Sequence, residues 1–73
     1  MSMYQFNRFE LKVMYLFWLN GALTVREAHR MLSGGHAYSM LMETVLRLEE
    51  KETLKRIGTV NSELAFEPAF SLS

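Results

Sequence analysis

The sequence predicts a mainly α-helical domain with a small β-hairpin at its end, the fold class of a winged helix-turn-helix with three helices and a wing. Three observations predict it. Helix-capping patterns begin at Asn7 and at Thr24. A Gly-Gly break at residues 34–35 separates two apolar, helix-periodic stretches. Two short runs around a segment rich in Gly, Asn and Ser then indicate a hairpin.

Length and composition limit the possible architectures. A chain of 73 residues predicts a single domain, residues 1–73. There is no cysteine, so the core must come from apolar side chains, and 49% of the residues are hydrophobic. This is more than one small core can bury, which indicates a partner or a second subunit. The net charge of +0 counts against strong nonspecific binding of nucleic acid.

The N-terminal region carries no evident targeting signal. The first ten residues lack a basic region followed by an apolar run. The apolar stretch at 11–19 is too short to span a bilayer. We therefore expect a soluble, cytoplasmic protein.

The first helix is expected over residues 7–20. Asn7 can accept a hydrogen bond from the backbone N–H of Glu10, whose carboxylate can reach back to form a capping box. Gly21 suits the left-handed C-terminal position. One side of the helix is expected to carry Phe9, Val13, Leu16, Phe17 and Asn20. Other apolar residues cover much of the rest, which is typical of a helix central to a core or partly covered by a partner.

The second helix is expected over residues 24–32, after an extended segment at Leu23. Thr24 with Glu27 three residues later forms a second capping box. The third helix is expected over residues 38–51. Its buried face is defined by apolar residues at i, i+4 and i+7, namely Leu41, Val45 and Leu48.

The wing hairpin is expected over residues 54–67. Two runs, 54–57 and 63–67, flank a turn predicted at 58–62. Pro68 is expected to end the second strand because proline cannot donate to a sheet.

Several stretches also resemble a known family. ELKVM at 10–14, LFW at 16–18, LTVREAH at 23–29 and RLEEK at 47–51 are similar to segments of the penicillinase-repressor family. The combination of TVRE with RLEEK carries most of the specificity. The resemblance implies a winged helix-turn-helix that represses bacterial transcription and binds palindromic operators in double-stranded DNA as a dimer.

The same resemblance implies roles for individual residues. It makes residues 38–51 the recognition helix. The positions that would face the DNA groove are Ser39, Met40, Glu43, Thr44 and Arg47. Near the start of the second helix, Thr24 and Arg26 would lie close to a phosphate. Lys55 and Arg56 would approach the DNA backbone from the wing.

Some positions depart from the family pattern. Family sequences tend to have threonine at the positions of Met40 and Glu43 and a polar residue at that of Leu46. The family's usual glycine after the recognition helix is Glu52 here. A carboxylate on a groove-facing surface repels phosphates, although it can accept from cytosine N4.

A second functional class therefore stays open. Four apolar residues form a possible interface for a homodimer or another protein: Tyr15, Leu19, Met40 and Leu46. The alternative to a DNA-binding regulator is a winged helix that modulates a regulator or an enzyme without touching DNA.

Catalytic and metal sites are not expected. The chain has no Asp and no Cys to complete a site around His29 or His36. Residues 34–35 do not match a phosphate-loop pattern. We expect no enzymatic activity, no cofactor, no metal and no small-molecule substrate.

Overall fold

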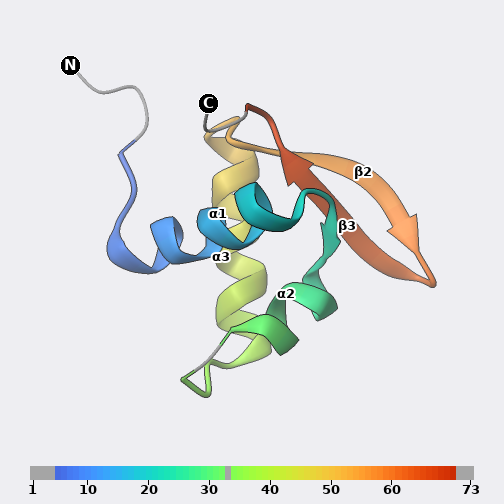
Figure 1. The fold of residues 1–73 in the computed structure, drawn as a ribbon, viewed down its shortest axis with the longest axis horizontal. Helices are drawn as coiled ribbons and strands as arrows, with labels where there is room; N and C mark the ends of the chain where they lie inside the picture. The colour runs from blue at the N-terminus through green and yellow to red at the C-terminus, as the bar shows by residue number, and fades with distance from the viewer. Residues whose placement is uncertain (1–4, 33, 71–73) are drawn as a thin grey trace.

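The computed structural model of the chain describes residues 5–32 and 34–70 (Figure 1). Within these residues the elements follow in the order α1 (Arg8–Asn20), β1 (Leu23–Thr24), α2 (Val25–Met31), α3 (Tyr38–Glu50), β2 (Leu54–Val60) and β3 (Glu63–Pro68). Helices followed by an antiparallel hairpin confirm the predicted winged helix-turn-helix.

Both predicted capping boxes are present. The Asn7 side chain accepts from the Glu10 N–H at 2.7 Å, and the Asn7 N–H donates to the Glu10 carboxylate at 2.9 Å. At α2, Thr24 Oγ1 accepts from the Glu27 N–H at 3.0 Å, and the Thr24 N–H donates to the Glu27 carboxylate at 2.8 Å. Each box satisfies N–H groups that a helix N-terminus otherwise leaves unpaired.

The end of α3 is a Schellman motif that lacks the usual glycine. Glu52, with a φ of 64°, occupies the left-handed position. Its N–H donates to the Glu49 carbonyl at 2.9 Å, and the Thr53 N–H donates to the Leu48 carbonyl at 3.0 Å. The buried Thr53 hydroxyl donates to the same Leu48 carbonyl at 3.0 Å and holds the motif in place.

The three strands form an antiparallel sheet in the order β1-β3-β2. The hairpin turn is shorter than predicted, because β2 continues through residues 58–60. Only Asn61 and Ser62 form the turn, with φ of 52° and 68°, as a two-residue type I′ hairpin requires. Gly58 marks a β-bulge next to Ile57, not the predicted turn.

The core lies between the helices and the sheet. Its fully buried members come from every helix and from β1 and β3, with Leu54 at the start of β2. The buried face of α1 differs from the predicted one, since Glu10 and Met14 are buried with Val13 and Phe17, whereas Asn20 is exposed. The helix is rotated because Glu10 reaches α3, a long-range contact that local periodicity does not reveal.

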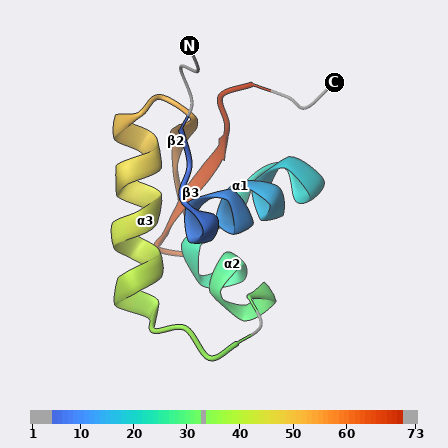
Figure 2. The same ribbon diagram turned by 90° about the vertical axis from the view of Figure 1, so that its left-hand side faces the viewer.

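The arrangement leaves one long face of α3 uncovered. Figures 1 and 2 show α1 and α2 packed on one side of α3. In Figure 1, the start of α1 lies on one flank of α3 and the β2–β3 hairpin on the other. Trp18 Nε1 donates to the Phe70 carbonyl at 3.2 Å, so the segment after β3 returns to α1.

Candidate nucleic-acid interface

The surface of α3 that faces away from the core is the candidate interface. Its exposed residues, here called the outer face of α3, are Ser39, Met40, Glu43, Leu46, Arg47 and Glu50. The predicted inner residues Leu41, Val45 and Leu48 are fully buried on the opposite side. The structure thus brings four of the five predicted groove-facing residues together on one surface.

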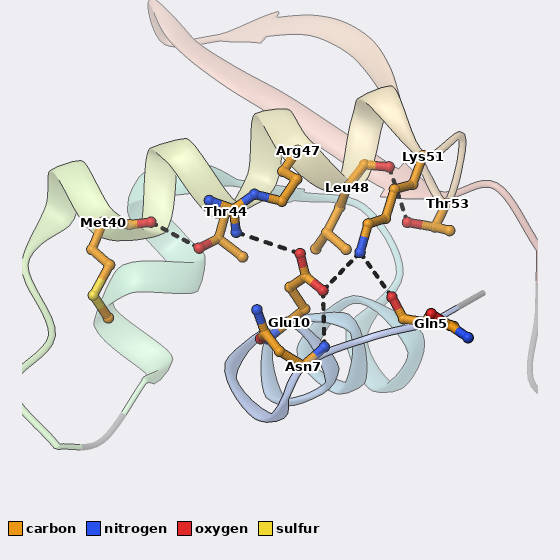
Figure 3. A network of polar contacts seen from close by, with 9 residues as sticks. All are labelled: Gln5, Asn7, Glu10, Met40, Thr44, Arg47, Leu48, Lys51 and Thr53. Carbon is orange, nitrogen blue, oxygen red and sulfur yellow. Dashed lines mark hydrogen bonds and ion pairs between the residues drawn. The ribbon is translucent and has the colours of Figure 1, made fainter.

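Thr44 is the exception, and its predicted position was wrong. It is only 3% exposed, and its hydroxyl donates to the Met40 carbonyl at 2.9 Å (Figure 3). Thr44 lies three residues after Leu41 and four before Leu48, which places it on the buried side of the helix. Its hydroxyl is therefore occupied inside the fold.

Arg47 is held by a buried carboxylate of α1. Its guanidinium lies 3.4 Å from Glu10, and Lys51 Nζ lies 2.8 Å from the same carboxylate (Figure 3). The Arg47 side chain is 47% exposed, whereas that of Glu10 is 2% exposed. Arg47 therefore faces solvent on one side while it joins α1 to α3 on the other.

The environment of Glu10 favours its charged form. Burial alone would raise the pKa of this carboxyl. The hydrogen bond from Lys51, the Asn7 backbone N–H and the charge of Lys51 outweigh burial and, with the Arg47 hydrogen bond, lower the pKa of Glu10 below its ordinary value. The capping role of Glu10 was predicted, but its role as the carboxylate that holds two cations of α3 was not.

Two further cations that were predicted to contact DNA, Arg56 and Arg26, are also paired with glutamates within the fold. Arg56 forms two hydrogen bonds to Glu49 of α3, at 3.1 and 3.0 Å, and stacks over Phe66. Arg26 lies 3.1 Å from Glu63 at the hairpin. These pairs attach the hairpin to α3 and α2, and they reduce the positive charge that the predicted residues offer to DNA.

Thr24 and Lys55 are the remaining residues that were predicted to contact the DNA backbone, and the first is buried whereas the second is exposed. Thr24 is buried, and its hydroxyl accepts the Glu27 N–H, which confirms its capping role; its place near a phosphate stays a prediction. Lys55 is exposed on β2 and has no ion pair within residues 5–32 and 34–70. Lys55 is thus the predicted backbone contact whose charge is free.

The four residues of the possible protein interface lie on two separate surfaces. Tyr15 and Leu19 are exposed on α1, and Leu19 is 78% exposed. Met40 and Leu46 are exposed on the outer face of α3. The fold therefore presents two apolar patches, Tyr15 with Leu19 and Met40 with Leu46.

The histidines take structural positions around the turn before α3. His29 Nε2 lies 2.8 Å from the His36 carbonyl, and its ring packs against Tyr38. Across residues 5–32 and 34–70, no group of three or more potential metal-binding side chains is present. In the same residues, no helix has the length and apolar character to cross a membrane.

Comparison with known proteins agrees with the sequence resemblance. The family model described as penicillinase repressor matches residues 7–72, nearly the whole chain. A search of curated proteins found no significant match.

Proposed function

Because the chain belongs to the penicillinase repressor family, which consists of non-enzymatic, DNA-binding transcriptional repressors, we propose that it binds operator DNA with the outer face of α3 in the major groove. A single observation carries this proposal: within residues 5–32 and 34–70, no other element covers the outer face of α3, and the hairpin lies beside it (Figure 2). A major groove about 12 Å wide admits one helix of this kind.

The side chains of the outer face suggest how bases would be read. The Ser39 hydroxyl can donate or accept, and the Glu43 carboxylate can accept from cytosine N4. Met40 and Leu46 can contact thymine methyl groups. Lys55 would hold the DNA backbone from the hairpin. Arg26 and Arg56 could also contact the backbone, but each is already engaged in an ion pair within the fold.

DNA binding at low salt tests this proposal. The affinity for random duplex DNA should fall as salt rises, and Lys55→Ala should reduce the log–log slope by about 0.9, the loss of one phosphate contact. Glu43→Gln should raise nonspecific affinity about 2–5-fold, because a repulsive charge of about 0.5–1 kcal/mol is removed. Absence of measurable binding at low salt would reject the proposal.

A homodimer is the proposed assembly, since two-fold symmetric operators call for two copies of a reading helix. The exposed Tyr15 and Leu19 of α1 support it, because small monomers rarely expose large neighbouring apolar side chains. Sedimentation equilibrium should detect a dimer that Leu19→Ser weakens. A monomer at every concentration would exclude this assembly.

A protein-binding winged helix is the second candidate. It is favoured by the combination of exposed Met40 and Leu46 with two carboxylates, Glu43 and Glu50, that have no ion pair in the described part of the chain. Under this function Leu46→Glu would abolish capture of a partner while DNA binding is absent in the wild type. Salt-dependent DNA binding by the wild type would decide against it.

A further inference from the structure

Among the described residues, Lys55 is the one positive charge free to bind anions that stands at a position indicated by the family resemblance. All eight acidic residues are glutamates within the described ranges. Four of the eight cations form ion pairs with three of these glutamates: Arg26, Arg47, Lys51 and Arg56. The other four have no ion pair within residues 5–32 and 34–70: Arg8, Lys12, Arg30 and Lys55. An anion is therefore attracted most where these free cations gather.

Two of the free cations share one hollow with a histidine. Arg8, Phe9, Lys12 and His36 line a hollow of about 240 Å³ between the first two turns of α1 and the turn before α3. Arg8 and Lys12 stand four residues apart and are both exposed, so they lie on the same side of the helix. None of the lining residues is acidic. Arg8, Lys12 and His36 are here called the basic hollow.

The histidine of the basic hollow is held in place from several sides. Its ring centroid lies 4.7 Å from that of Phe9, at an angle of 51° between the rings. Its Nε2 faces Gly34, whose lack of a side chain leaves room for the ring. Its carbonyl lies 2.8 Å from His29 Nε2. The surface inside the hollow is almost entirely apolar, so an anion would bind to the charged ends of Arg8 and Lys12 at its rim, next to the imidazole.

We infer that the basic hollow binds a phosphate of the DNA backbone, on the flank of α3 opposite the hairpin. The inference rests on the proposed function. Figure 1 shows the start of α1 on one side of α3 and the hairpin on the other. The molecule measures 38 × 26 × 21 Å. Each of these dimensions exceeds the width of a major groove, about 12 Å, so both flanks of α3 could reach the backbone beside the groove.

The two flanks then have matching roles. Lys55 approaches the backbone from the hairpin, and the basic hollow approaches it from α1. Phosphate contacts of this kind set the register of the reading helix and carry no sequence information themselves. A chain of net charge +0 can attract DNA in this way because its charges are unevenly placed: five glutamates have no ion pair within the described residues, but none of them lines the basic hollow.

Salt-dependent DNA binding by two matched variants tests the inference. Lys12→Gln removes one free cation from the basic hollow, and Arg30→Gln removes one from α2, where Glu27 and Glu63 line the same hollow as Arg30. Lys12→Gln should reduce the log–log slope by about 0.9, which lowers affinity about 3–4-fold more at 50 mM than at 200 mM salt. Arg30→Gln should leave the slope unchanged. Circular dichroism should show both variants folded, because both side chains are exposed.

The outcomes separate the inference from the proposed function. If the wild type binds DNA but the log–log salt slope is unchanged in Lys12→Gln, the inference alone is overturned. An equal reduction of the slope in Arg30→Gln would also overturn it, because it would show an effect of net charge and not of the basic hollow. A wild type that does not bind DNA would overturn both. Inorganic phosphate distinguishes a free anion from a phosphate of DNA. If millimolar phosphate shifts the NMR signals of the His36 ring while Lys12→Gln leaves the salt slope of DNA binding unchanged, the site binds free anions and the inference is overturned.

Discussion

Glu10→Gln tests whether one buried carboxylate joins α1 to α3. The substitution keeps the size of the side chain, and its amide oxygen can still accept from the Asn7 N–H. It removes the negative charge that lies 2.8 Å from Lys51 Nζ and 3.4 Å from the Arg47 guanidinium. Two cations of α3 would then lose their common partner.

The expected loss of stability follows from the burial of the partners. Removal of one partner from a fully buried ion pair costs about 3–5 kcal/mol, because the other charge stays buried and unpaired. Here water can solvate the cations that remain, since the Lys51 and Arg47 side chains are 35% and 47% exposed. A loss of about 1–2 kcal/mol is therefore expected. For a domain of this size it lowers Tm by about 5–15 °C.

Urea unfolding followed by the fluorescence of the single tryptophan, Trp18, measures this loss at pH 7. Glu27→Gln is the matched control, because Glu27 has the same place in the α2 capping box but no ion pair among the described residues. The pKa of Glu10 is lowered in the folded state, so its stabilisation is present above the ordinary pKa. It is lost as the pH falls through the lowered value. The gap between wild type and Glu10→Gln should shrink on acidification.

Two results would refute this reasoning. Equal free energies of unfolding for the wild type and Glu10→Gln at pH 7 would mean that the ion pairs contribute nothing. A gap that stays constant as the pH falls would mean that the loss comes from packing and not from the charge of Glu10.

Three further substitutions test the local structure. Glu52→Gly should stabilise the fold by about 1 kcal/mol in thermal unfolding, because glycine adopts the left-handed conformation without strain; a lower Tm would contradict the Schellman assignment. Ser62→Gly should stabilise the hairpin by about 0.5–1 kcal/mol, since Asn-Gly is the preferred type I′ sequence, and unchanged stability would count against that turn. Thr44→Val should leave DNA affinity unchanged, because the hydroxyl is buried, and a drop at equal stability would return Thr44 to the interface.

The sequence predicted those parts of the fold that depend on neighbouring residues. Both capping boxes and the buried stripe of α3 follow from patterns within a few residues, and the structure has them. The hairpin was predicted, but its turn was placed too early, because Gly58 was read as a turn residue. Glycine serves equally at a bulge, and the two roles differ only in the register against β3.

The candidate site was harder to predict because charge pairing acts over long distances along the chain. Glu10 lies 37 residues from Arg47 and 41 from Lys51. Without the fold, Arg47 and Arg56 resemble free cations that could contact DNA, whereas Arg8 and Lys12 resemble ordinary surface residues. The burial of Thr44, in contrast, follows from the sequence, because residues 41, 44, 45 and 48 share one side of a helix.

The position of Arg47 also limits which bases the outer face of α3 can read. An arginine that reads guanine donates two N–H groups of its guanidinium, to O6 and N7, and must point them at the base. If Arg47 turned to a base, Glu10 would keep only Lys51 and the Asn7 N–H as partners, and the link between α1 and α3 would weaken. If Arg47 read guanine, the protein would therefore lose part of the folding free energy that the Glu10→Gln substitution measures. The other exposed side chains, Met40, Glu43 and Leu46, offer a carboxylate for cytosine and apolar contacts for thymine. Selection from random duplexes should therefore enrich C·G pairs whose selection is lost in Glu43→Gln, and C·G pairs whose selection is lost in Arg47→Gln but kept in Glu43→Gln would show that Arg47 leaves Glu10.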